Sequence, residues 1–410
     1  MSGKVSILKQ PRTVWAVAFA CVVAFMGIGL VDPILPAISA QLDATPTQAE
    51  LLFTSYLFIT GLAMLVTSFI SSRIGARPTL LIGLALIVVM ALCAALANDV
   101  DVVIAFRGGW GLGNALFIST ALATIVGAAA GGSGAAIVLY EAALGLGIAI
   151  GPLLGGLLGT VSWKGPFFGV ATLMCVAFVA ILVWLPKETA EAKVARVHLP
   201  LSAPLRALGN PAILVLAIAA LWYNVGFFVL LAYTPFPLGF TAIGLGLTFF
   251  GWGVAVAISS VWGAPLLTSR FRRTSVLTAV LPLLAADLVV MGVFISSPVA
   301  LVCCVVGGGL LLGILNTVFT ESVMNATDLP PRVASSAYSS VRFLGGAAAP
   351  PLATTLAALA GPAIPYFLAS AFVVVAALTI AIGRKALHRI DGPAVPELLE
   401  AEAIGLGDTT

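Results

Sequence analysis

The sequence predicts an all-α integral membrane protein, with twelve transmembrane helices arranged as two pseudo-symmetric six-helix bundles. Two observations lead to this fold class. The 410 residues are 61% hydrophobic and only 9% charged, with a mean hydropathy of +1.16, whereas soluble domains carry about 25% charged residues. The apolar residues also form long continuous runs, and each run reaches the roughly 20 residues that a membrane-spanning helix needs.

Twelve such runs follow one another along the chain. The first follows Lys4, Lys9 and Arg12 in the manner of a signal peptide, but it is longer than the cleavable apolar segment of about 7 to 15 residues. We therefore expect it to remain as the first span. The predicted spans are 14–38, 50–71, 79–97, 102–126, 134–158, 166–185, 211–233, 243–267, 275–296, 299–322, 334–358 and 362–383.

The charges of the connections predict the orientation of the spans. Connections on one side hold most of the 19 Lys and Arg residues. The other side holds a single cation, Lys164, together with Asp43, Glu50, Asp99 and Asp101. Because cytoplasmic connections carry the excess of Lys and Arg, we expect both termini in the cytoplasm. The protein is predicted to lie in the plasma (inner) membrane of a bacterium, with the lipid bilayer as its surroundings.

The spans divide into two groups of six. Residues 1–186 are predicted to form the first bundle, 187–209 a cytoplasmic linker, 210–389 the second bundle and 390–410 a flexible cytoplasmic tail. A shift of about 197 to 199 residues places Ser72-Arg73 on Ser269-Arg270. The same shift places Gly147 and Pro152 on Gly345 and Pro350. The two halves therefore look like a duplication.

The fifth span is unusually rich in residues that disfavour helices. It contains Gly147, Gly151, Pro152, Gly155 and Gly156 within one apolar stretch. A glycine costs about 1 kcal/mol and a proline about 3 kcal/mol in the interior of a helix in water. In a membrane, small residues instead allow close packing of helix backbones, and neighbouring helices satisfy freed backbone groups. The stretch predicts a bent, tightly packed helix that can move.

This stretch and two further motifs resemble the major facilitator superfamily, most closely its twelve-span drug:proton antiporter branch. The span-five residues match the pattern GxxxGPxxGG of that branch, and Arg107, Gly111 and Gly113 match RxxxGxG, with Trp110 where glutamine is common. The loop after span two matches in part. There the chain has SFISSRIGAR, which keeps Arg73, Gly75 and Arg77 of the gate loop but carries Ser72 in place of the usual aspartate and Ser68 in place of the leading glycine.

Three charged residues inside the spans are candidates for proton or substrate binding, because charges within a membrane are costly and are usually functional. Asp32 and Arg107 lie at similar depths, and the resemblance implies that their spans line a central cavity. Asp32 is thus predicted to exchange a proton under the influence of Arg107. The alternative is a permanent ion pair without a role in transport. Glu141, in the fifth span, is either a second protonation or substrate site or a locally satisfied carboxyl.

The remaining charges within spans are predicted to be structural. Glu321 and Arg342 lie towards the same membrane surface and are expected to pair. Asp287 is expected to face protein or water rather than substrate, since the resemblance makes its span peripheral. Polar and aromatic residues on the other spans are candidates for lining the cavity, with simple packing as the alternative: Tyr56, Asn114, Trp222, Tyr223, Asn224, Phe228, Trp252, Asn316 and Tyr338.

The predicted function is proton-coupled efflux of small amphipathic organic compounds by alternating access. The alternatives on the same fold are a proton-coupled importer of a sugar or metabolite and a lipid flippase, and a receptor or scaffold remains open. An enzyme is not expected, because His, Asp and Glu do not cluster with catalytic or metal-binding spacing. We expect no cofactor, no metal and no nucleic-acid partner, five buried structural cysteines, and a monomer whose partners are protons and a small-molecule substrate.

Overall fold

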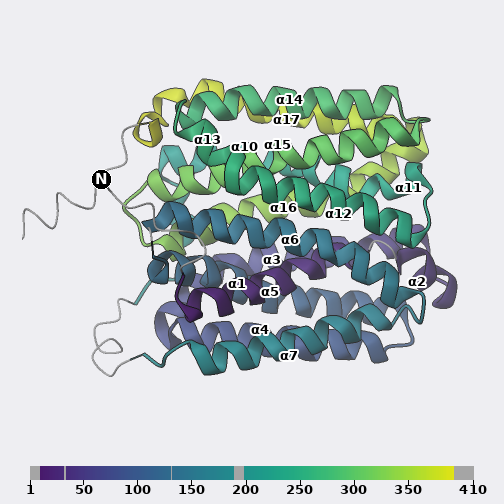
Figure 1. Cartoon of the computed structure of the whole chain (residues 1–410), viewed down its shortest axis with the longest axis horizontal. Helices are drawn as coiled ribbons and strands as arrows, with labels where there is room; N and C mark the ends of the chain where they lie inside the picture. The colour runs from purple at the N-terminus through teal and green to yellow at the C-terminus, as the bar shows by residue number, and fades with distance from the viewer. Residues whose placement is uncertain (1–9, 32–33, 131, 189–197, 392–410) are drawn as a thin grey trace, which may run out of the picture.

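Long parallel and antiparallel helices make up the computed structural model of this protein (Figure 1). It describes residues 10–31, 34–130, 132–188 and 198–391. Among these residues, twelve helices are long and apolar enough to cross a membrane. The predicted fold class is therefore confirmed, and each predicted span overlaps one of these helices.

Each half of the chain supplies six of the long helices. The first half contains α1 (Arg12–Gly29), α3 (Pro46–Ile74), α4 (Ala76–Leu96), α5 (Val100–Ala128), α6 (Gly132–Gly159) and α7 (Gly165–Trp184). The second half contains α10 (Pro211–Phe228), α12 (Ala242–Ile258), α14 (Arg273–Val293), α15 (Pro298–Asn325), α16 (Pro331–Ala360) and α17 (Ile364–Ile382).

Short elements extend or connect the long helices. The first predicted span differs from the structure, because α1 ends at Gly29 and a separate helix α2 (Leu35–Gln41) follows. Two spans continue through a π-helical turn. Helix α9 (Ala203–Ala207) precedes α10, and η2 (Val229–Tyr233) and α11 (Pro235–Leu238) follow it. Helix α12 is followed by η3 (Ser259–Gly263) and α13 (Ala264–Thr268), and α17 is followed by η4 (Gly383–Lys385) and η5 (His388–Asp391).

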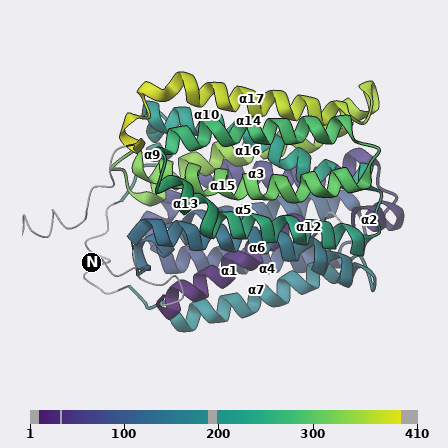
Figure 2. The same ribbon diagram turned by 45° about the horizontal axis from the view of Figure 1, so that its top comes forward.

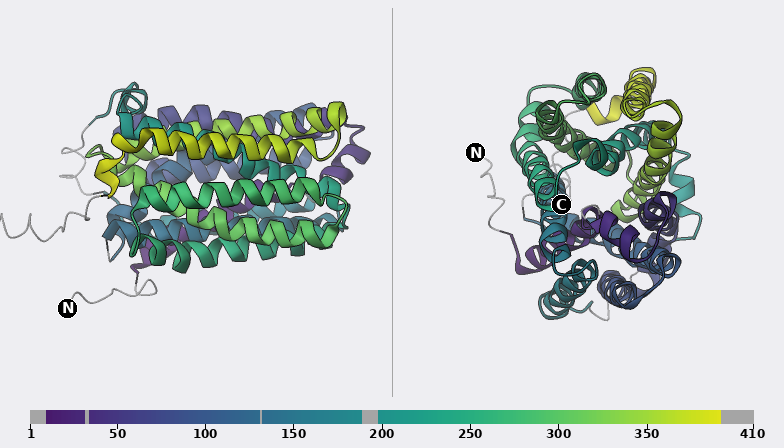
Figure 3. Two further views of the ribbon diagram at one scale, coloured as in Figure 1. Left: turned by 90° about the horizontal axis from the view of Figure 1, so that it is seen from above. Right: turned by 90° about the vertical axis from the view of Figure 1, so that its right-hand side faces the viewer.

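The two halves share one packing plan. In the first half, α1 packs on α6 and α7, α3 packs on α5, and α4 packs on α5 and α7. In the second half, α10 packs on α16 and α17, α12 on α15, and α14 on α15 and α17. Helices that occupy the same position in the order of the two halves thus make equivalent contacts, as a duplication requires. Figure 2 and the end-on view in Figure 3 show the first half, coloured purple to teal, beside the second half, coloured green to yellow.

The two ends of the helix array differ in charge. One end, here called the basic end, carries Arg73, Arg77, Arg206, Arg270 and Arg332 at or near the helix termini. The opposite end carries α2 and α11 and is called the α2 end (Figure 1). Arg73 stacks on the ring of Phe69, with 4.2 Å between its Cζ atom and the ring centroid.

The gate loop at the basic end forms a tight turn. Gly75 lies between α3 and α4 with a φ of 94°, a value that L side chains rarely adopt. Arg77 donates a hydrogen bond to Leu182 O of α7 at 2.7 Å. Ser72 Oγ accepts a hydrogen bond from Leu199 N at 3.1 Å. The serine that replaces an aspartate in the motif therefore fastens the described part of the linker to the first half.

Helix α6 belongs to the first half and lies at the contact with the second half. Its glycines allow close packing of α6 on α1. A Cβ atom on Gly147 would lie 2.4 Å from Val22 O. The same atom on Gly151 would lie 2.5 Å from Met26 O, and on Gly155 2.3 Å from Leu30 O. These positions are four residues apart, so they form one stripe along α6. Gly345 of α16 has the same relation to α10, where a Cβ would lie 2.3 Å from Leu221 O.

The opposite face of α6 packs on α12 of the second half. A Cβ on Gly253 would lie 2.2 Å from Ala149 Cβ, and a Cβ on Gly145 would lie 2.7 Å from Val256 Cγ1. The second contact between the halves joins α3 to α16. There, a Cβ on Gly61 would lie 3.1 Å from Ser340 O. Both contacts between the halves therefore depend on close backbone approach.

Substituting Gly151 by Ala is expected to destabilise the protein, because the added methyl group meets the carbonyl oxygen of Met26. Overpacking of this kind costs about 1–3 kcal/mol. Gly134→Ala on the same helix is the matched control, because nothing lies within 4 Å of its Cβ position. Thermal unfolding of the purified protein should show a lower midpoint for Gly151→Ala and an unchanged or higher one for Gly134→Ala. Equal midpoints would contradict the packing argument.

Candidate functional site

A buried polar cluster joins the two halves near the middle of the helix array. Its only described acid, Glu141, comes from α6, nine residues after the start of that helix. At 1.5 Å per residue this places Glu141 about 14 Å from the basic end. The other members come from α10, α15 and α16 of the second half. Glu141 is 0% exposed, as are Asn316 and Tyr223.

Glu141 is bound directly to the second half. Thr320 Oγ1 of α15 donates a hydrogen bond to Glu141 Oε1 at 2.7 Å. The second carboxyl oxygen, Oε2, is buried without a hydrogen-bond partner among the described residues. The Arg342 guanidinium of α16 is close enough for its charge to act on Glu141. The Glu141 carboxyl and the Arg342 guanidinium, which come from opposite halves, thus lie within electrostatic range of each other and away from solvent.

Amide and phenol groups surround Arg342. Its Nη2 donates to Asn316 Oδ1 at 3.1 Å, and Tyr223 OH donates to the same oxygen at 2.9 Å. Asn224 Nδ2 donates to Arg342 O at 2.7 Å. The hydroxyl of Tyr338 and the amide nitrogen of Asn316 are buried and have no partner in the described part of the chain. The cluster therefore keeps several donors and acceptors available in its interior.

Aromatic rings form the apolar wall next to the cluster. Tyr223 stacks on Phe319, with 4.9 Å between ring centroids. Trp252 of α12 meets Phe227 edge to face at 5.7 Å, and Phe227 lies 4.8 Å from Phe228. Aromatic walls with a few convergent polar groups are typical of sites for small organic molecules.

The structure corrects one predicted pair. Glu321 and Arg342 do not pair: Glu321 Oε2 lies 3.3 Å from Nε of Arg273, at the start of α14. Arg273 also donates to Ile390 O at 3.0 Å. The prediction was wrong because Arg342 lies deeper, eleven residues after the start of α16, where the partner within reach is Asn316.

The predicted cavity residues of the second half do not all lie at one site. Tyr223, Asn224, Asn316 and Tyr338 belong to the cluster, and Trp252 and Phe228 belong to the adjoining wall. Trp222 lies apart, because it stacks on Phe372 of α17 with 5.1 Å between ring centroids. Thr320 was not predicted. It follows Asn316 by four residues on one helix, and this spacing places both side chains on one face.

Arg107 occupies a second buried site within the first half. Its Nε donates to Leu52 O at 3.2 Å and its Nη1 to Gly27 O at 3.1 Å. The Cζ atom lies 4.5 Å from the centroid of the Tyr56 ring and 4.8 Å from that of Trp110. Asp32, its predicted partner, lies outside the described residues.

Asn114 is another predicted cavity residue of the first half, seven positions after Arg107 on α5. It is 0% exposed, and neither amide atom has a hydrogen-bond partner among the described residues. The glycines of its motif serve helix packing. A Cβ on Gly111 would lie 2.4 Å from Tyr56 O, and a Cβ on Gly113 would lie 2.8 Å from Gly83 O.

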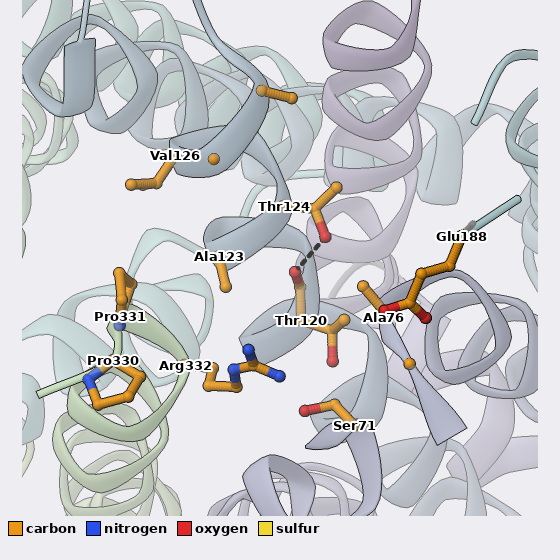
Figure 4. Close-up of a pocket in the computed structure, with 13 residues that line it drawn as sticks. Ser71, Ala76, Thr120, Ala123, Thr124, Val126, Glu188, Pro330, Pro331 and Arg332 are labelled. Atoms are coloured by element: carbon orange, nitrogen blue, oxygen red, sulfur yellow. Dashed lines mark hydrogen bonds between the residues drawn. The ribbon is translucent and has the colours of Figure 1, made fainter. Parts of the chain in front are cut away.

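The two ends of the helix array contain cavities of unequal size. At the basic end a cavity of about 450 Å³ lies between the halves and is lined by Ser71, Thr120, Thr124, Glu188 and Arg332, among others. Figure 4 shows Arg332 extending towards Thr120 and Ser71. At the α2 end, the space lined by Glu50, Phe53, Tyr233 and Thr354 measures only about 10 Å³.

Two hydrogen bonds close the α2 end between α3 and α16. Thr354 Oγ1 donates to Glu50 Oε2 at 2.5 Å, and Thr54 Oγ1 donates to Ala347 O at 3.3 Å. Glu50 was predicted only as a charge at the outer side, yet it is 7% exposed. None of the cluster residues named above lines either of these two described cavities.

Comparisons with known proteins agree with this architecture. A sequence model of the Major Facilitator Superfamily matches residues 17–350. The multidrug efflux protein YfmO of Bacillus subtilis is 50% identical over 95% of this chain and 98% of its own length. A chloramphenicol resistance protein of Streptomyces lividans is 30% identical over 90% of this chain and 94% of its own length.

A solved structure shows the same fold. The crystal structure of the human organic anion transporter MFSD10 aligns with a TM-score of 0.69 at 17% identity, and the match covers 90% of this chain and 99% of that one. The likeness at this identity concerns the fold alone. Taken with the match over residues 17–350, the paired six-helix plan establishes that this chain belongs to the major facilitator superfamily.

Proposed function

We propose that this chain exports small amphipathic organic compounds by alternating access, driven by protons that bind to Glu141. The observation that carries the proposal is the placement of Glu141: a buried carboxyl of the first half that is hydrogen-bonded to Thr320 and faces the charge of Arg342 in the second half. The full-length likeness to a multidrug efflux protein and to a chloramphenicol resistance protein supports the same direction and class of cargo.

The charge of Glu141 links proton binding to the contact between the halves. Charges attract each other far more strongly in a buried site than in water. While Glu141 is ionised, its attraction to Arg342 holds α6 against α15 and α16. When a proton binds, this attraction is lost and only the hydrogen bond to Thr320 remains, so the halves separate more easily at this level.

The surroundings of the cluster suggest the chemistry of the cargo. Stacked rings of Tyr223 and Phe319 and the nearby Trp252 offer an apolar aromatic surface. Unpartnered polar atoms of Asn316 and Tyr338 offer hydrogen bonds. A compound with a flat apolar body and a polar or cationic group matches both features, and the cationic group is attracted by the aromatic faces and by Glu141.

The state of the two ends matches one stage of an alternating-access cycle. The basic end is hollow and the α2 end is closed by Glu50 and Thr354. We propose that the basic end faces the cytoplasm of a bacterium, in agreement with its arginines. Export then requires the α2 end to open to the outside. The two halves of one chain enclose the cluster, which supports a monomer as the working unit.

Asp32 and Arg107 remain a second proposed proton site. Arg107 is held by carbonyl oxygens of α1 and α3 and by two aromatic rings. Such fixed surroundings suit a guanidinium that sets the charge state of a neighbouring carboxyl. In this proposal Asp32 exchanges protons in addition to Glu141.

Glu141→Gln is expected to abolish export driven by a pH gradient, because the amide keeps the shape but cannot bind and release the proton. The measurement is uptake of a fluorescent cationic dye into reconstituted inside-out vesicles with an imposed gradient. Glu321→Gln is the matched control, since its partner is Arg273 rather than the cluster, and its transport should keep its dependence on the gradient. Full gradient-driven transport by Glu141→Gln would refute the role of this residue.

Thr320→Val should weaken the link between the halves without removing the proton site. A hydrogen bond to a charged group contributes about 1.5–3 kcal/mol, so the balance between open and closed states should move by roughly tenfold or more. The same vesicle assay should show transport with an altered rate and with its dependence on the gradient retained. A variant that loses the dependence on the gradient would assign the proton site differently.

Thr354→Val should open the α2 end. Valine has nearly the shape of threonine but lacks the hydroxyl group that donates a hydrogen bond to Glu50. Spin labels at the exposed positions Val161 and Leu359, in a cysteine-free background, report the separation of the halves at this end. The distance distribution is expected to shift to longer values. Thr172→Val is the control, since its hydroxyl bonds only within α7, and identical distributions for both variants would contradict a latch at Thr354.

A further inference from the structure

A second acidic side chain, half-buried and with one carboxyl oxygen fully buried, lies among helices of the second half, away from the contact between the halves. Asp287 belongs to α14, which packs on α15 and α17. Its carboxyl group faces two glycines of α15. A Cβ on Gly308 would lie 3.1 Å from Asp287 Oδ2, and a Cβ on Gly307 would lie 3.8 Å from Oδ1. An ionisable residue at this depth is a candidate functional group.

The carboxyl of Asp287 lacks a charged partner. Oδ2 is buried without a hydrogen-bond partner among the described residues. The titratable group that faces it from α15 is the Cys304 thiol, which hydrogen-bonds the carboxyl. Two tyrosines lie on the neighbouring elements, Tyr366 on α17 and Tyr233 on η2. Their hydroxyl groups influence each other electrostatically, and Cys304 also influences Tyr366. No Lys, Arg or His in the described ranges pairs with Asp287.

The position opposite Asp287 also touches the π-helical segment η2. A Cβ on Gly308 would lie 2.7 Å from Leu230 Cδ1, so Asp287 and Leu230 approach the same spot on α15. Segment η2 ends at Tyr233, and Tyr233 lines the narrow space at the α2 end together with Glu50 and Thr354. Asp287 is therefore connected through packed side chains to the closure at that end. π-Helical turns within α-helices frequently occur at functional sites.

We propose that Asp287 is a proton-binding site of the second half, separate from Glu141, and that its charge state controls segment η2. With its proton bound, the neutral acid fits between Gly308, Cys304 and Leu230. Release of the proton leaves a carboxylate whose burial without a cation is costly. The carboxylate then requires water, and admitting water displaces Leu230 and loosens η2 beside the α2-end closure.

Hydrogen–deuterium exchange of the full chain in lipid nanodiscs tests this inference and needs no substrate. Peptides covering η2 are followed against pH, after correction for intrinsic exchange. In the unaltered chain, protection of η2 should fall by roughly tenfold or more as pH rises through the titration of Asp287. Asp287→Asn, which stays neutral, should keep η2 protected over the whole range. The same pH dependence in Asp287→Asn as in the unaltered chain would overturn the proposal.

Two glycine variants test whether Asp287 causes the pH dependence of η2 protection, even if Asp287→Asn fails to fold. Gly308→Ala displaces both Asp287 Oδ2 and Leu230, so the midpoint of the pH dependence should move. Gly307→Ala is the matched control, because its new methyl group makes only an ordinary contact with Oδ1. Equal midpoints in the two variants would overturn the proposal.

Glu141→Gln separates this site from the central cluster. The pH dependence of η2 should persist in this variant, because Asp287 is unaltered and lies in the second half. If Glu141→Gln abolishes that dependence, the titrating group is Glu141 and the inference is wrong. The inference does not rest on the proposed cargo or on the direction of transport.

Discussion

Close approach of helix backbones on both faces of α6 is the constraint on which the rest of this structure depends. Within a membrane the hydrophobic effect does not drive helices together, so packing and hydrogen bonds must do so. The glycine stripe of α6 places that helix directly on α1, and its other face meets Gly253 of α12. The same helix carries Glu141. Backbone packing therefore decides where the carboxyl of the first half meets the second half.

The central cluster shows how opposite charges are kept within a membrane. Glu141 and Arg342 each belong to a different half, and neutral side chains such as Thr320 and Asn316 satisfy part of their hydrogen-bonding capacity. Removing one member of a buried charged pair costs about 3–5 kcal/mol, because the other charge is left without compensation. Protonation of the carboxylate likewise leaves the guanidinium without an opposite charge, so the protonation state of Glu141 changes the stability of this buried arrangement. This property makes a carboxylate, rather than a second fixed charge, suitable for coupling.

Much of the fold could be predicted from the sequence, because span length and glycine spacing are local properties. Glu141 could be singled out for a similar reason, since an acid within an apolar run is rare. Its partners could not be predicted, because they depend on which faces of the two halves meet. Approximate depth suggested Glu321 as the partner of Arg342, whereas Arg342 lies deeper than Glu321 and the partner within reach of Glu321 is Arg273, at the start of α14.

The pair Trp222 and Tyr223 shows a limit of another kind. Adjacent residues of a helix point about 100° apart, and here Tyr223 and Asn224 reach the cluster whereas Trp222 points towards Phe372 of α17. Short elements show the same limit. Helix α1 ends and α2 begins within one predicted span, 14–38, which contains two prolines. Composition alone did not show whether the helix bends there or ends.

The closure at the α2 end is slight, and this has a thermodynamic consequence. Two hydrogen bonds join α3 to α16 there, one of them to the Glu50 carboxyl. Their combined contribution of about 2–4 kcal/mol changes the ratio between shut and unshut molecules by a factor of roughly 30 to 1,000. A ligand whose affinities for the two states differ by a similar factor is sufficient to offset this contribution.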